Sequence, residues 1–156
     1  MKARQLEDGI IKTFSRVPKR LDKVIGGFDT LSDSELESFG LYDVVIPVIK
    51  ESQQLGDIEW DSDNSVFVYP VEDKVFSKSL AEMKAEKIVD LKSIYAHELS
   101  KTDWIIIRDQ EMGNTTDSDV LSARVALRAN CATKEDAING KTTKANVADY
   151  SLPNLG

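Results

Sequence analysis

The longest periodic pattern of apolar positions along the chain lies between residues 77 and 99. Its apolar positions recur at steps of three and four residues: Ala81, Ala85, Ile88, Leu91, Tyr95 and Leu99. This spacing puts side chains on one face of an α-helix, and charged residues fill the other faces. The pattern therefore predicts an amphipathic helix with one narrow apolar stripe. Because the stripe is shorter than the roughly three to four heptads typical of a coiled coil, we expect it to pack on the chain's own sheet.

The N-terminal half has shorter patterns that are typical of β-strands. Residues 10–17 alternate between apolar and polar positions, and residues 41–49 are rich in β-branched side chains. Residues 57–60 and 65–71 flank a polar turn at 61–64, which predicts a β-hairpin. These strands predict a small antiparallel sheet. Since so small a sheet is marginal alone, the long helix is expected to cover its apolar face.

A capping box predicts a short helix before the strand at 41–49. Ser32 is followed three residues later by Glu35, so that the serine hydroxyl can accept a main-chain N–H while the glutamate reaches back. Gly40 can adopt the left-handed conformation that ends such a helix. The helix is therefore expected to extend from about Asp33 to Phe39.

The chain after the long helix divides into four predicted segments. The apolar run at 104–107 is too short for an independent helix, so it is predicted to be extended. Two helices are predicted at 118–131 and 133–140, the second with Thr133 as its N-cap. Residues 141–156 lack periodicity and predict an extended arm that is ordered mainly by a partner.

Together these patterns predict an α+β fold. A small antiparallel sheet in the N-terminal half is covered by a long amphipathic helix, followed by short helices and an extended C-terminal arm. The predicted regions are a β-rich N-terminal region at 1–76, a helical region with a Thr-Asp-Trp segment at 77–140, and the arm at 141–156. A chain of 156 residues with 41% apolar content is about the size of one domain.

Composition and charge exclude several classes of function. A net charge of −7 argues against a nucleic-acid binder, because phosphate neutralisation needs a concentrated basic surface. No apolar run approaches the roughly 20 residues of a spanning helix, and the first residues lack the apolar core of a signal peptide. The sequence therefore predicts a cytosolic product that binds neither nucleic acid nor membranes.

One acidic stretch imitates a calcium-binding loop. Asp61, Asp63, Ser65 and Glu72 have the ligand spacing of an EF-hand. The sixth position, where that loop needs glycine, is Val66, and the following residues have the pattern of a strand. The stretch is therefore predicted to be a solvated hairpin turn.

No other pattern predicts an active site or a cofactor site. The single Cys131 and the single His97 are too few for a disulfide or a zinc site, and no second histidine could serve a cysteine nucleophile. His97 is expected at the surface near the end of the long helix, and Cys131 is expected to be buried or half-buried. Nucleotide-binding and hydrolase motifs are absent from the sequence, so we expect a non-enzymatic protein without cofactors.

Trp104 has two alternative interpretations. It is either a core residue or the anchor of a protein interface, where tryptophan and arginine are enriched. The nearby Asp103, Arg108, Arg124 and Arg128 would let the ring pack beneath arginine stems that have carboxylate partners.

The stretch from 77 to 130 resembles a family of bacteriophage proteins. The segment Leu99-Ser-Lys-Thr-Asp-Trp104, a short linker and Arg124-Val-Ala-Leu-Arg128 are similar to a signature of small tail proteins and tail-assembly chaperones of tailed bacteriophages. The upstream residues 31–42, followed by Gln54-Leu-Gly56 before a hairpin, are similar to the β-rich front half of some of these proteins.

The resemblance implies a non-enzymatic tail protein that binds a tail-fibre or other tail subunit. It would be a structural component of the virion tail, or an assembly factor in the host cytoplasm, and association with itself is left open. The residues expected to contact a partner are Trp104, Arg108, Arg124, Arg128, Tyr150 and Leu152. The alternative is a small regulatory module that binds an unrelated host or phage protein.

Overall fold

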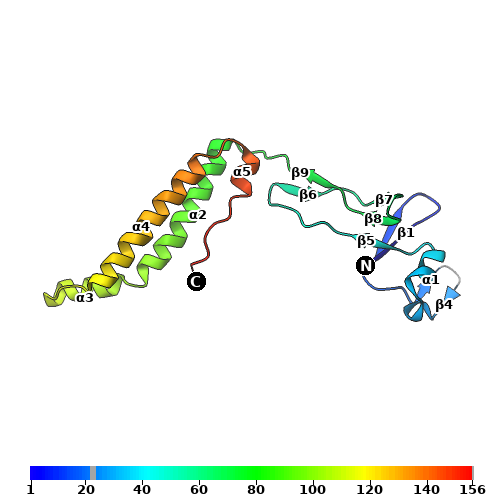
Figure 1. Ribbon diagram of the computed structural model, residues 1–156, viewed down its shortest axis with the longest axis horizontal. Helices are drawn as coiled ribbons and strands as arrows, with labels where there is room; N and C mark the ends of the chain where they lie inside the picture. Colours follow the sequence, from blue (N-terminus) through cyan, green and yellow to red (C-terminus); the bar gives the residue numbers. More distant parts are fainter. Residues whose placement is uncertain (22–23, 156) are drawn as a thin grey trace. The chain divides into compact units, whose positions relative to one another are not determined.

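The computed structural model describes residues 1–21 and 24–155, and its chain divides into two compact units, Met1–Lys74 and Val75–Gly156 (Figure 1). The first unit contains the β-strands and the second contains the long helices. The predicted α+β class is therefore confirmed. None of the described helices is long and apolar enough to cross a membrane.

The first unit is built on a five-stranded sheet of order β2-β1-β5-β8-β7. Its strands are β1 (Lys2–Gln5), β2 (Ile11–Phe14), β5 (Tyr42–Val45), β7 (Glu59–Asp61) and β8 (Val66–Val68). The hairpin of β7 and β8 is confirmed, but β5 and β8 are parallel, so the prediction of a purely antiparallel sheet is wrong. Parallel neighbours need a long connection, which the chain between β5 and β8 supplies.

Two strand pairs lie outside this sheet. The elements are β3 (Arg20–Leu21) with β4 (Val24–Ile25), and β6 (Gln53–Leu55) with β9 (Val71–Asp73). Both pairs are antiparallel. Strand β6 lies on the long connection between β5 and β8, and β9 follows β8 in the chain.

A small helix closes the core of the first unit. After the 3-10 turn η1 (Phe28–Thr30), helix α1 (Asp33–Ser38) begins at Ser32, which forms the predicted capping box with Glu35. The buried residues of this core are Leu21, Phe28, Leu36 and Leu41. Below them, the ammonium group of the buried Lys2 lies 2.7 Å from Asp33 and 3.1 Å from Asp43. The ion pairs therefore join β1, α1 and β5.

The second unit is organised around α2 (Leu80–Ser100), which confirms the long helix. Leu91 and Tyr95 of the predicted stripe are buried, whereas Ala81 and Ala85 are exposed. The buried part packs against Ile138 of helix α4 (Ser118–Asn139) and against the C-terminal residues. The expectation that this stripe covers the sheet is therefore wrong, because the stripe is occupied within its own unit.

Two predictions for the following segments are also wrong. Residues 104–107 belong to helix α3 (Asp103–Met112), and the two helices predicted from 118 to 140 are one helix, α4 (Ser118–Asn139). Thr133 does not act as an N-cap, because its hydroxyl donates to the carbonyl of Ala129 one turn earlier.

The C-terminal residues pack on the helices of the same chain. Helix α5 (Lys144–Ala148) begins at Thr143, whose side chain accepts from the N–H of Asn146. Val147 is buried, and the ammonium group of Lys87 donates to the carbonyl of Ala148, which ties α5 to α2. The prediction of an arm that needs a partner to order it is therefore wrong.

Candidate protein-interaction surface

Trp104 lies on the first turn of α3, and the residue is 58% exposed. Helix α3 begins after Thr102 and ends at Gly113, whose φ of +67° is in the left-handed region that favours glycine. The interpretation of Trp104 as a core residue is therefore wrong. The residue lies on a regular helix and is more exposed than buried.

One of the predicted arginines, Arg108, lies over the exposed ring. The guanidinium carbon of Arg108 lies 5.0 Å from the centroid of the Trp104 ring, a cation–π distance. Arg108 also donates to the carboxylate of Asp109, from Nε at 3.1 Å and from Nη2 at 2.8 Å. Asp109 is buried, so the arginine is held over the ring by a fixed partner.

Arg124 has a different position from Arg108. Its side chain is only 11% exposed, and its guanidinium group reaches the end of α2 and the start of α3. Nη1 donates to the carbonyl of Leu99 at 2.7 Å, and Nη2 donates to Asp103 at 2.6 Å. All these partners are in the same chain, so Arg124 joins three helices and positions α3.

Arg128 lies one turn further along α4, beside an open hollow of about 250 Å³ between α2 and α4. Tyr95, Leu99 and Cys131 line the hollow, and Cys131 is half-buried. Burial, followed by the nearby carboxylate of Glu135, raises the pKa of the Cys131 thiol above its ordinary value. The thiol is therefore less ionised near neutral pH than an ordinary cysteine.

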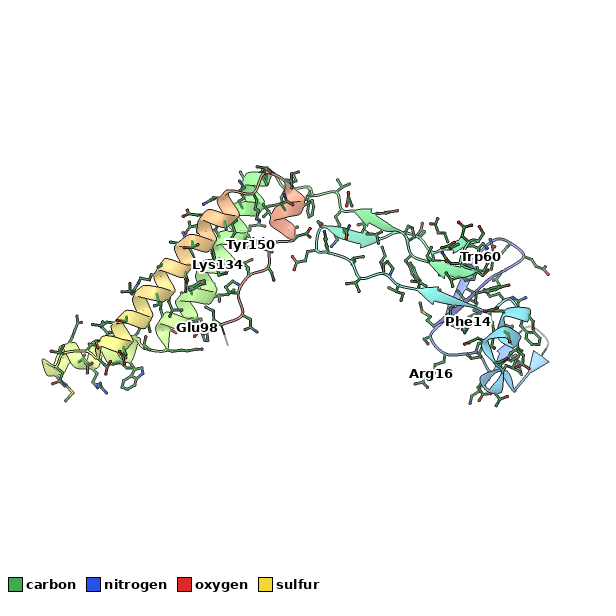
Figure 2. All side chains as sticks on the ribbon, viewed as in Figure 1. Phe14, Arg16, Trp60, Glu98, Lys134 and Tyr150 are labelled. Atoms are coloured by element: carbon green, nitrogen blue, oxygen red, sulfur yellow. The ribbon has the colours of Figure 1, made fainter. Side chains whose placement is uncertain are left out.

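Tyr150 and Leu152 do not form a free arm. Both pack, half-buried, against the cluster of Leu91, Tyr95 and Ile138, and Tyr150 lies beside the helices in Figure 2. The ammonium group of Lys141 lies 5.3 Å from the centroid of the Tyr150 ring. Both residues contribute to the core of the second unit, so replacing them would affect folding as well as any contact with a partner.

Four further exposed apolar residues lie on α3 and α4. We use the name α3–α4 surface for this set together with Trp104: Trp104, Ile107 and Met112 on α3, and Leu121 and Val125 on α4. Exposed apolar side chains that gather on a surface are typical of sites that bind another protein. Ile107 and Met112 were not predicted as exposed helix residues, because residues 104–107 were expected to be extended and Met112 was expected in a turn. Thr102 before the run and Gly113 after it were the available signals of a helix.

The acidic stretch at 61–72 has the predicted hairpin geometry. The carboxylate of Asp61 accepts from the main-chain N–H groups of Asp63 and Asn64 and from the Asn64 side chain. Hydrogen bonds from Asn64, chiefly, hold the pKa of Asp61 below its ordinary value. Within residues 1–21 and 24–155, no group of three or more His, Cys, Asp or Glu side chains could hold a metal ion. His97 is exposed, as expected.

Comparisons of the chain with protein-family models, with curated proteins and with solved structures find no match.

Proposed function

We propose that the chain is a non-enzymatic protein of a bacteriophage tail that binds a tail-fibre or other tail subunit through the α3–α4 surface. The single observation on which this proposal depends is the exposed Trp104, fixed beneath Arg108 on a regular helix. The resemblance of residues 77–130 to small tail proteins and tail-assembly chaperones supports a tail subunit as the partner.

The chemistry of the surface favours a protein partner. Tryptophan and arginine together are enriched at the centres of protein interfaces, where a large ring is desolvated and a charge is paired. The carboxylate of Asp109 already pairs with Arg108, so burial of this arginine against a partner leaves no unpaired charge. Ile107 and Val125 extend the apolar contact around this centre.

The internal contacts of Arg124 keep the surface in place before binding. Because the guanidinium group ties Leu99 and Asp103 to α4, the first turn of α3 is held where Trp104 is presented. A surface that is ordered before association loses less conformational entropy when it binds. We assign Arg124 a positioning role and Trp104 the role of a direct contact.

The test is copurification of the full chain with a co-expressed tail-fibre subunit. Trp104→Ala is expected to lower recovery of the complex at least tenfold, since truncating a central tryptophan costs about 2 kcal/mol or more in binding. Val89→Ala, an exposed apolar residue on α2 outside the surface, is the matched control and is expected to bind normally. Equal recovery with Trp104→Ala and Val89→Ala would overturn the proposal.

Mass spectrometry of purified particles separates a virion component from an assembly factor. A stoichiometric amount of the chain in the particle indicates a structural component, and a chain found only with the free subunit indicates an assembly factor. A chain that binds neither particle nor tail subunit would favour the regulatory alternative and contradict the proposal.

A further inference from the structure

An extended stretch of the first unit exposes a continuous run of β-branched side chains. We call residues 45–49 the apolar segment: it begins at the last residue of β5 and leads toward β6, as Figure 1 shows. Val45, Ile46, Val48 and Ile49 are all exposed, and Val48 is 100% exposed. A fully exposed valine inside such a run gains nothing from burial in its own unit, so the segment is a candidate contact surface.

The main chain of the apolar segment has an open side. The N–H of Val44 donates to the carbonyl of Met1, toward β1, and the carbonyl of Val45 accepts from Tyr69, toward β8. Continuing the alternation of β5 (Tyr42–Val45) places the main-chain groups of Ile46 and Val48 on the side of β1. Among the described residues, neither makes a main-chain hydrogen bond. These groups can therefore pair with an added strand.

Pro47 lies where a proline does not hinder an added strand. By the same alternation it faces the side of β8, so its missing N–H is not needed for pairing on the open side. In an antiparallel pair, residues that face away from the partner strand form the non-hydrogen-bonded positions. Pro47 is therefore suited to the centre of a pair in which Ile46 and Val48 make the hydrogen bonds.

We propose that the apolar segment pairs antiparallel with the same segment of a second copy, around a two-fold axis at Pro47. This register places Ile46 of each copy opposite Val48 of the other, and Val45 opposite Ile49. The pairs of Ile46 with Val48 and of Val45 with Ile49 are then β-branched, and such pairs stabilise antiparallel strands. At the axis, Pro47 lies opposite its symmetry mate. The pairing ends at Val45, because Met1 occupies the open side at Val44.

The area that a second copy could cover on the apolar segment is small. The four β-branched residues are between 37% and 100% exposed. Together they expose on the order of 400 Å² per chain, main chain included, about half of the roughly 800 Å² that each partner buries in a standard interface. Hydrogen bonds between the two main chains therefore have to supply part of the stability. The segment contains no charged residue, so two chains of net charge −7 can meet there without opposing like charges. The uncharged segment and its self-complementary register, rather than its area, favour a second copy as the occupant.

The first test is the mass of the full chain in solution, by size-exclusion chromatography with light scattering. The wild type is expected at about twice the chain mass of 17.4 kDa, and Val48→Glu is expected at the chain mass. Because Val48 is fully exposed, its replacement does not disturb the core. Val75→Glu is the matched control, since Val75 is 99% exposed outside the segment, and it is expected to stay dimeric. A monomeric wild type, a trimer, or a dimeric Val48→Glu would overturn the proposal.

The second test fixes the register with a disulfide, in a Cys131→Ala background under mild oxidation by oxidised glutathione. Opposed residues of a non-hydrogen-bonded pair have Cα atoms about 4.5 Å apart, within the range of about 4.4–6.8 Å that a disulfide needs. Pro47→Cys is therefore expected to give a covalent dimer. Ile49→Cys on the same strand lies too far from its symmetry mate and is expected to stay uncoupled. Coupling of Ile49→Cys in preference to Pro47→Cys would contradict the two-fold pairing at Pro47.

Discussion

The two units leave apolar groups exposed in different ways. In the first unit, the exposed residues of the apolar segment come with open main-chain groups at Ile46 and Val48. In the second unit, the exposed residues of the α3–α4 surface are on helices, whose interior main-chain groups pair within the helix. The first kind of surface can be extended by a strand, whereas the second can only be covered by side chains of a partner.

Under the two proposals, this difference would give the two units different partners. A strand edge recognises main chain and pairs well with an identical segment, which suits association between copies. A helical surface centred on Trp104 and Arg108 recognises particular side chains, which suits a specific tail subunit. The same chain can then associate with itself through one unit and bind a tail subunit through the other.

The largest expected effect comes from removing a core residue of one unit only. Phe28 is 1% exposed, so Phe28→Ala is expected to lower the free energy of unfolding of the first unit by about 3–5 kcal/mol. Amide hydrogen exchange of the full chain would show this loss of stability as faster exchange in the strands of the first unit. Exchange in α2 and α4 is expected to stay unchanged. An equal loss of protection in both units would show that the two cores unfold together. That result would contradict the description of two separately stable units.

A smaller effect is expected from the two arginines of α4, which form a matched pair. Arg124→Ala removes charge-assisted hydrogen bonds to Leu99 and Asp103 and is expected to cost about 2 kcal/mol of stability in thermal or urea unfolding. Arg128→Ala, at an exposed position, is expected to change stability by less than about 0.5 kcal/mol. If the two variants were equally stable, Arg124 would not have the positioning role given to it.

The smallest effect concerns the capping box of α2. The hydroxyl and main-chain N–H of Ser79 hold the pKa of Glu82 below its ordinary value of 4.5. Because the folded pKa is the lower one, the stabilisation is present above the unfolded value and is lost as pH falls through the folded value.

The melting temperature of the wild type is therefore expected to fall as the pH drops below about 4.5, and Glu82→Gln is expected to reduce that fall. Ser79→Ala should lower stability by about 1 kcal/mol at neutral pH. The pH dependence should be seen in the helical signal of circular dichroism. A Glu82→Gln variant with the full wild-type pH dependence would contradict this assignment.

Features that depend on local sequence were predicted well. The period of the stripe predicted α2, and the spacing of Ser32 and Glu35 predicted α1, because both depend on contacts within a few residues. The placement of Arg108 over Trp104 also follows from an i,i+4 spacing once α3 is a helix. Thr133 misled the prediction because a threonine can cap a helix or bond back to the previous turn, and local sequence does not distinguish the two.

Features that depend on distant contacts could not be predicted. Whether Trp104 is buried depends on what packs against α3, and the bond from Arg124 to Leu99 joins residues on different helices. The β-branched run at 41–49 predicted a strand, but nothing local shows that its neighbours end at Met1 and Tyr69 and leave the apolar segment exposed. The apolar stripe of α2 likewise packs against α4 and the C-terminal residues, which its own sequence does not indicate.

The most direct test of the proposed division of roles is amide hydrogen exchange of the full chain, alone and with a purified tail-fibre subunit. Binding is predicted to slow exchange in α3 and the first half of α4, around Trp104 and Val125, and to leave residues 45–49 unchanged. Slower exchange at residues 45–49 with no change in α3 would contradict the proposal that the helical unit binds the tail subunit.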